Sequence, residues 1–509
     1  MALLFGIGLS ASAAEQNLYT PGHDTENYYV LFSSGELLYN QKYSATDFIP
    51  VQAGKHYIIP RNRMLAFYNP KHVYISGIEN GKSPLEFTAP AGAAYVRISI
   101  DKKWDGFTME EQEMFSVNLP SRICMYGGAP LAIYHHGLLE NGAGEYFFKW
   151  SCPVGRAMKD ALVFDVGIAP GIYPLKLEVF DGRMKKVAES LSELTVNNGS
   201  GKNRKIKLLV IGDSLSNDKP WINNLMSLAE SSVAPGALTM VGTRGGELRH
   251  EARSGYTTDG YLRDSQYGYQ GNYKLMLASA DCAVPLKTRC KLLTIYGSYS
   301  DFEVEEISHK EGNWLYLNRV DGKGEPLPSG TVEFLRGDQA PGTDKVSYAE
   351  AVCTSYNPFW NPVNKSVDFA YYEKKTGVRP DVVVLFLGTN DYDSKDYTIN
   401  MSSLIAALNQ AWNVPVLVVL PPFRGPQDIM GRQFGTKMYS VEAHQTMFRQ
   451  HRAALAELAG LRNVTLVPLS LCFDAENNYA GADAVHPAGA GKGYSEIADA
   501  IFGALLTVW

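Results

Sequence analysis

Four continuous apolar runs constrain the fold of this chain more than any other feature. The runs are KIKLLVIG (205–212), DVVVLFLG (381–388), VPVLVVLP (414–421) and VTLVPLS (464–470). A strand with one face in water alternates polar and apolar residues, whereas a parallel strand covered by helices on both faces is apolar throughout. Segments with helical character lie between or after these runs, at 218–233, 400–412, 437–459 and 491–506. The pattern predicts a three-layer α/β domain with a parallel sheet, over residues 204–509.

The remaining segments have the short alternating pattern of exposed β-sheets. Residues 15–114 predict a β-sandwich module of jelly-roll type, and residues 115–200 predict a small Ig-like β module. A polar linker, NNGSGKNRK, separates these modules from the α/β domain. Within that domain, residues 286–346 return to β-like segments and predict a β insertion. His135 and His136 are expected in one strand of the second module, on opposite faces, where they cannot easily share a metal ion.

The first residues predict a targeting segment. Ala2 to Ala14 reads ALLFGIGLSASAA, an apolar stretch that ends in small residues. We interpret residues 1–14 as a truncated signal peptide that lacks its positive end, and a flexible arm is the alternative. The first interpretation predicts a secreted or periplasmic bacterial protein. No run of about 18 apolar residues occurs, so the sequence predicts no integral membrane segment.

Charge and cysteine content exclude some classes of partner. The chain has 47 Lys and Arg against 53 Asp and Glu, a formal charge of −6, which gives no electrostatic case for binding nucleic acid. The six cysteines form no CxxC pair and no metal-like spacing. The sequence leaves two alternatives for them. They form disulfides between the nearest pairs, Cys124 with Cys152 and Cys282 with Cys290, or they are buried free thiols.

Four short blocks place reactive residue types at or near strand ends. GDSL puts Ser214 after the first apolar run, and GTND puts Asn390 after the second. SGYTT supplies Gly255, where a glycine lets the backbone approach a ligand closely. In DAVHP, Asp483 can orient the ring of His486 so that its other nitrogen takes a proton. Each block alone is also compatible with an ordinary turn, because Ser, Asn and Asp are common turn residues.

The four blocks in this order, GDSL, SGYTT, GTND and DAVHP, resemble the SGNH (GDSL-type) hydrolase family over about residues 204–509. The resemblance implies that Ser214 is the nucleophile, His486 the general base and acid, and Asp483 the orienting carboxylate. It also implies an oxyanion hole made of the backbone N–H groups of Ser214 and Gly255 and the side-chain amide of Asn390. The reaction needs no metal and no cofactor.

Two aromatic residues are candidates for contact with substrate. Tyr256 follows the oxyanion glycine directly, and Trp360 lies within NPFWNP. We interpret Trp360 as a packing residue, with a sugar platform as the alternative. The first β module, through runs such as ATDFIPV and AFYNP, resembles modules that precede catalytic domains in bacterial secreted enzymes and phage tail proteins.

The sequence therefore predicts a multi-domain serine esterase that hydrolyses O-acyl esters, acetyl esters foremost, on carbohydrate. Two β modules before a hydrolase suit attachment to a polymer, which is an argument by association. The alternatives are a phage tail-associated esterase of surface glycans, a lipase or lysophospholipase, and a glycan-binding adhesin without enzymatic activity.

Overall fold

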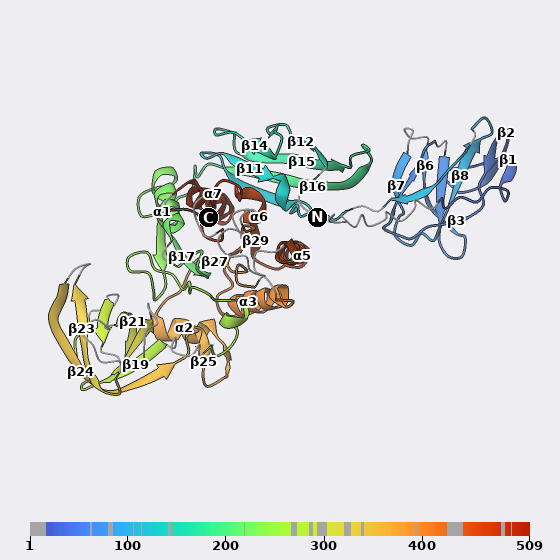
Figure 1. Ribbon diagram of the computed structural model, residues 1–509. Helices are drawn as coiled ribbons and strands as arrows, with labels where there is room; N and C mark the ends of the chain where they lie inside the picture. Colours follow the sequence, from blue (N-terminus) through green and yellow to red (C-terminus); the bar gives the residue numbers. More distant parts are fainter. Residues whose placement is uncertain are drawn as a thin grey trace, which may run out of the picture. The chain divides into compact units, whose positions relative to one another are not determined.

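The computed structural model of the protein shows a sheet-rich molecule of several sheets (Figure 1). It describes residues 17–509 apart from 62–63, 80–84, 105, 113–114, 141–143, 145, 218, 266–271, 285–288, 293–302, 320–326, 337–339, 392–393, 425–440, 480–483 and 490. The predicted signal peptide lies outside these residues. The chain forms two compact units, one of Met1–Ser116 with Lys185–Ala188, the other of Val117–Met184 with Glu189–Trp509.

The first unit consists of antiparallel strands packed around an apolar core. One sheet has the order β1-β2-β8-β5-β6, with β3 also paired to β8, and a second sheet has the order β7-β4-β9. Alternate residues such as Leu65, Val96 and Ile98 are fully buried between them. The strands are β1 Thr25–Val30, β2 Leu37–Ala45, β3 Ile49–Pro50, β4 His56–Ile59, β5 Met64–Tyr68, β6 Tyr74–Glu79, β7 Leu85–Thr88, β8 Tyr95–Asp101 and β9 Glu110–Gln112.

The second unit begins with a small two-sheet sandwich. Its sheets have the orders β10-β16-β15-β12 and β11-β14-β13, and β10 pairs with β16 in parallel. The strands are β10 Arg122–Tyr126, β11 Leu131–Tyr134, β12 Phe147–Ser151, β13 Arg156–Ala157, β14 Ala161–Phe164, β15 Gly171–Phe180 and β16 Lys186–Asn197. The expectation that His135 and His136 belong to a strand is wrong, because the chain turns after β11 into a short 3-10 helix, His135–Gly137.

A five-stranded parallel sheet forms the centre of the second unit, in the order β18-β17-β27-β28-β29. Its strands are β17 Ile206–Gly212, β18 Leu238–Val241, β27 Val382–Phe386, β28 Val416–Leu420 and β29 Val464–Pro468. The helices are α1 Pro220–Ser232, α2 Phe369–Thr376, α3 Tyr397–Ala411, α5 Val441–Glu457, α6 Leu469–Cys472 and α7 Lys492–Val508.

The apolar strands of this sheet serve two cores, one on each face. In β17, Leu208 and Val210 belong to the core that α1 and α7 cover, whereas Leu209 and Ile211 belong to the core beneath α2, α3 and α5. All four side chains are fully buried. Because neighbouring strand residues point to opposite faces, burial on both faces requires an uninterrupted apolar run.

The predicted β insertion is a closed six-stranded barrel, in the order β19-β22-β21-β20-β23-β24. Its strands are β19 Asn272–Leu277, β20 Arg289–Leu292, β21 Glu303–Glu311, β22 Trp314–Arg319, β23 Gly330–Arg336 and β24 Ala340–Thr354. The barrel starts and ends on one antiparallel pair, Asn272 with Thr354, so it extends beyond the interval 286–346. The hairpin of β25 (Trp360–Asn361) and β26 (Ser366–Val367) then leads to α2.

The small sandwich packs directly on the α/β domain. A Cβ atom on Gly503 of α7 would lie 2.8 Å from the backbone of Met125 and Tyr126 in β10, so only glycine permits this approach. The Tyr126 hydroxyl also lies 2.6 Å from Ser232 Oγ at the end of α1. Within the described ranges, no helix is both long and apolar enough to cross a membrane. The six cysteines all lie within the described residues, and none of them forms a disulfide.

Candidate active site

Ser214 lies in the tight turn that follows β17. The backbone N–H groups of Ser216 and Asn217 donate to the Asp213 carbonyl, and the Trp221 indole donates to the Leu215 carbonyl, which ties the turn to α1. A Cβ atom on Gly212 would lie 2.7 Å from Ser216 Oγ, so the strand must end in glycine. The turn leaves the Ser214 side chain partly exposed at the carboxyl end of the sheet, where open α/β sheets bind ligands.

His486 meets Ser214 from the other end of the domain. Its Nε2 atom lies 2.8 Å from Ser214 Oγ, although 272 positions separate the two residues. His486 belongs to the loop before α7, and this loop is held by the Ala488 N–H, which donates to the Asn478 carbonyl. The structure thus pairs the predicted nucleophile with its predicted base. Asp483, the predicted orienting carboxylate, lies outside the described residues.

The two other strand-end blocks are tied to each other. The Asn390 amide donates to the Tyr256 carbonyl over 2.9 Å. The Asp391 carboxylate accepts hydrogen bonds from the Thr258 backbone N–H at 3.1 Å and from the Thr258 hydroxyl at 2.6 Å. The amide nitrogen of Asn390 carries two hydrogens, so its bond to Tyr256 does not use up its capacity to donate. These bonds fix the loop that contains Gly255 against the end of β27.

Gly255 lies at the exposed tip of that loop. Its φ angle is +76°, in the left-handed region that glycine adopts without strain, and no atom lies within 4 Å of a Cβ added there. The loop begins beside the nucleophile, because the Arg253 N–H donates to the Gly212 carbonyl at 2.9 Å. Asn217 also donates to Ser254 Oγ. Gly255 therefore belongs to the segment that borders the turn of Ser214.

A fully buried ion pair lies at the base of the loop that contains Gly255, and the sequence analysis did not predict it. Glu251 and Arg253 have no exposed side-chain surface, and their charged atoms lie 3.0 Å apart. The Glu251 carboxylate also accepts from the Thr243 N–H and hydroxyl and from the Tyr372 hydroxyl, each at 2.7 Å. Burial alone would raise the pKa of Glu251, but the Arg253 charge and these donors hold it below its ordinary value. The available signal was two opposite charges immediately before SGYTT.

The ring of Tyr256 lies in the core rather than at an open surface. It is 5% exposed and packs edge-on against Tyr261 and Tyr356, and its hydroxyl bonds to Ser265. This burial corrects the expectation of a substrate contact, because the ring presents almost no surface to a ligand. The contribution of Tyr256 is its carbonyl, which accepts the hydrogen bond from Asn390.

Asp213, next to the nucleophile, is an unusual carboxylic acid. It is fully buried, and its Oδ1 atom accepts the Leu215 N–H at 2.9 Å. No described group bonds to its Oδ2 atom. Burial, with a further contribution from the nearby Asp391 charge, raises the pKa of Asp213 to about 7. The neutral acid is therefore favoured below neutral pH, although hydrogen bonds from Leu215 and Thr389 act in the opposite direction.

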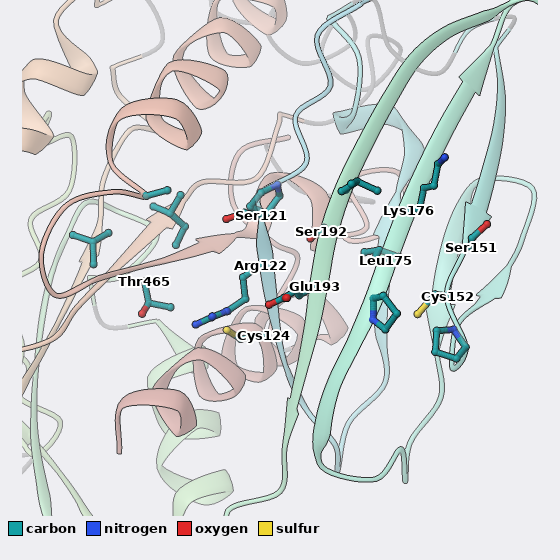
Figure 2. A pocket seen from close by; sticks show the side chains of 17 residues that line it. Ser121, Arg122, Cys124, Ser151, Cys152, Leu175, Lys176, Ser192, Glu193 and Thr465 are labelled. Atoms are coloured by element: carbon teal, nitrogen blue, oxygen red, sulfur yellow. The ribbon is translucent and has the colours of Figure 1, made fainter. Parts of the chain in front are cut away.

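Neither described cavity of the second unit contains the predicted site residues. The larger one, of about 960 Å³, lies between the small sandwich and β29, where Arg122, Glu193 and Thr465 line it (Figure 2). The smaller one, of about 340 Å³, lies between the barrel and α2. No group of three or more His, Cys, Asp or Glu side chains that could hold a metal ion occurs in the part of the chain that the structure describes.

No protein-family model matches the chain, and no curated protein sequence matches it. Among solved structures, a family two carbohydrate esterase from Clostridium thermocellum, an active-site mutant, is similar over 96% of this chain and 98% of its own, with 8% identity and a TM-score of 0.27. A family two carbohydrate esterase with a carbohydrate binding domain from Corynascus thermopiles is similar over 97% and 99%, with 10% identity and a TM-score of 0.27. A peptidoglycan O-acetylesterase is similar over 61% and 92%, with 14% identity and a TM-score of 0.29. At these TM-scores the similarities establish neither a shared fold nor a family.

Proposed function

We propose that the protein is a serine esterase of the SGNH (GDSL-type) kind, with Ser214 as nucleophile and His486 as general base and acid. The observation that carries the proposal is the 2.8 Å contact between Ser214 Oγ and His486 Nε2 at the carboxyl end of the parallel sheet. A nucleophile within hydrogen-bond reach of a base is the arrangement that covalent catalysis by serine requires. The tied loops of Gly255 and Asn390 add donors at the same edge.

The proposed reaction proceeds in two halves. His486 takes the proton of Ser214 as the hydroxyl oxygen attacks the ester carbonyl carbon. The N–H groups of Ser214 and Gly255 and the amide of Asn390 donate to the negative oxygen that forms. The tetrahedral intermediate expels the alcohol, which receives the proton from His486. Water then attacks the acyl-enzyme with His486 as base again, and the acid leaves.

Acetyl esters of carbohydrate are the proposed substrate class. This choice rests on the modular arrangement of β-rich segments before an α/β domain, and it is an argument by association. A panel of nitrophenyl esters of increasing acyl length, together with acetylated xylan and pectin, tests it. Preference for short acyl chains and release of acetate from the polymers are expected. A preference for long chains would favour a lipase or lysophospholipase, and no turnover of any ester would favour a binding protein.

The nucleophile itself is tested by labelling with a fluorophosphonate, which reacts covalently with activated serines. We expect mass spectrometry to locate the adduct on Ser214, and Ser214→Ala to abolish labelling. Ser216→Ala is the matched control, because it removes the same hydroxyl two residues along the same turn. Labelling that survives in Ser214→Ala would overturn the assignment. Because the proposed reaction uses no metal, EDTA should leave ester turnover unchanged.

A further inference from the structure

We propose that the cavity between the barrel and α2 is a saccharide-binding site, separate from the one that contains Ser214. Its volume of about 340 Å³ is within the range of roughly 300–1,000 Å³ that is usual for ligand pockets. Residues from β19, β21, β22, β24, β25 and α2 line it, so three parts of the fold converge there. None of the predicted catalytic residues is among its lining residues.

The first argument is the placement of aromatic side chains. Trp360 lines the cavity from β25, a two-residue strand held by its pairing with Val367. Its side chain is partly exposed and packs against no other aromatic ring among the described residues, in contrast to the packed rings of Phe359 and Phe369 close by. Tyr371, on α2, is also partly exposed and lines the same cavity. A sugar ring presents an apolar face of C–H groups, which packs favourably against such an aromatic surface.

The second argument is the rigidity of the polar lining. Asn318 is 3% exposed, and its amide donates to the Thr243 carbonyl at 3.0 Å and to the Thr243 hydroxyl at 2.7 Å. Asn357 is 2% exposed and donates to the Tyr261 carbonyl at 2.8 Å. Side chains fixed in this way cost little further ordering when a ligand binds. Both amide hydrogens of Asn318 and of Asn357 are used within the protein, so these two residues form a fixed wall of the cavity. The Tyr371 hydroxyl and the Lys274 ammonium, which also line the cavity, are the polar groups that we expect to bind sugar hydroxyls.

The third argument is charge, which favours a neutral ligand. The charged residues that line the cavity are Lys274, Lys375 and Asp264. Lys375 pairs with Glu311, and its ammonium lies 5.3 Å from the centre of the Tyr316 ring and 5.4 Å from that of Tyr371. Lys274 likewise lies over the Trp314 ring, at 4.2 Å. With Asp264 and with Glu311, the partner of Lys375, the two lysines make two positive and two negative charges at the cavity, so no excess charge favours an anionic or a cationic ligand.

Titration calorimetry on the full chain tests this proposal. The protein carries Ser214→Ala so that no probe is turned over, and the probes are xylotetraose, cellotetraose and tri-N-acetylchitotriose. Because binding is read without turnover, the result is independent of whether Ser214 is catalytic. We expect at least one probe to bind, and Trp360→Ala to weaken that binding by about tenfold or more, because it removes the stacking surface. Trp360→Phe, which keeps a ring, should lose less.

Tyr39→Ala is the matched control. Tyr39 is 63% exposed on β2 of the first unit, so this variant removes an exposed aromatic ring outside the cavity. Binding should be unchanged in it. If Trp360→Ala fails to fold by circular dichroism, Tyr371→Ala replaces it and should weaken binding in the same way. The proposal is overturned if none of the three probes binds, if the cavity variants bind as tightly as the parent, or if Tyr39→Ala alone loses binding.

Discussion

The carboxyl edge of the parallel sheet and the barrel cavity both gather polar and aromatic side chains, but they gather them differently. At the sheet edge, Ser214 follows β17 and Asn390 follows β27 within a few positions, whereas Gly255 and His486 lie on longer loops after β18 and β29. The cavity draws on residues from Thr243 to Thr376, and most of them lie inside strands or helices. The candidate residues at the sheet edge therefore lie in short sequence blocks far apart in the chain, whereas the residues that line the cavity are scattered singly through several strands and a helix.

The largest effect expected at the sheet edge is that of His486→Ala. Loss of the base should lower kcat for nitrophenyl acetate by roughly 10⁴-fold, because the Ser214 hydroxyl is a weak nucleophile without it. Steady-state kinetics with thermal melting checks this prediction. His444→Ala, which removes a histidine of α5, should retain most of the turnover. A folded His486→Ala protein with nearly full activity would show that the contact with Ser214 is only structural.

Glu251 lies between the two regions, since Thr243 and Tyr372, which bond to it, also line the cavity. Glu251→Gln keeps the shape but leaves the Arg253 charge buried without a counter-charge. We expect the free energy of unfolding to fall by about 3–5 kcal/mol, measured in urea. Glu178→Gln, in the partly exposed pair with Lys149, should change it by less than about 1 kcal/mol. Equal effects of the two substitutions would contradict a supporting role for the buried pair.

Asn390→Ala tests whether the Asn390 amide acts in catalysis or only holds the loop of Tyr256 in place. If its amide meets the developing oxyanion, kcat should fall by roughly 10²–10³-fold with little change in KM, because that interaction strengthens only in the transition state. If the residue only holds the Tyr256 carbonyl, stability should fall while kcat of the folded protein changes little. Kinetics on nitrophenyl acetate beside thermal melting distinguishes the two outcomes.

Asp213 gives the sheet edge a characteristic pH dependence. Because its pKa is raised to about 7 in the folded protein, the native state holds one more proton than the unfolded chain between about pH 4 and 7. Its contribution to stability is therefore lost progressively as pH rises from about 4 to about 7, by up to about 1.4 kcal/mol per pH unit, and the loss is complete above pH 7. Urea unfolding between pH 5 and 8 should show this loss in the parent protein. Asp213→Asn, which imitates the neutral acid, should not show it.

His309 in the barrel should show the opposite dependence, with a smaller effect. Burial, together with the Lys375 charge, lowers the pKa of His309 to about 4, so the unfolded chain binds the extra proton between about pH 4 and 6.5. Stability should fall by up to about 3 kcal/mol as pH falls through this window, at about 1.4 kcal/mol per pH unit. His309→Phe keeps a ring to stack on Tyr316 and should remove the dependence. The same slope in this variant would exclude His309 as its source.

Much of the α/β domain could be predicted because its strands and longer helices have hydrophobic patterns that are visible in short stretches of sequence. Burial on both faces makes β17, β27, β28 and β29 apolar throughout, and α1, α3, α5 and α7 lie close to the segments with helical character. The short helices α2 and α6 were not predicted, since a few residues carry too little periodicity. Closure of the barrel depends on pairs such as Asn272 with Thr354, which no local pattern reveals.

The residues of the candidate site likewise fall into those that a local sequence pattern predicts and those that it does not. Ser214 and Asn390 could be predicted because motif and strand end coincide, Gly255 was predicted from its motif alone, and the structure brings His486 to Ser214. The buried residues that support the loop of Gly255 were not predicted, because the role of Glu251 depends on a hydrogen bond from Tyr372, 121 positions away. The predicted contact of Tyr256 failed for a related reason: adjacency to Gly255 in sequence says nothing about which rings of the folded core surround it.

The closed barrel has a consequence for how the chain folds. β17 pairs with β27, and the contact between Leu208 and Val382 closes the long loop formed by all the residues between them. Since Asn272 pairs with Thr354, a barrel that forms first brings the ends of that intervening segment together and shortens the loop that remains to be closed. Closing a shorter loop costs less entropy and speeds non-local strand pairing. The barrel interrupts the sheet in sequence, but its early formation during synthesis would bring β17 and β27 closer together and so favour their pairing.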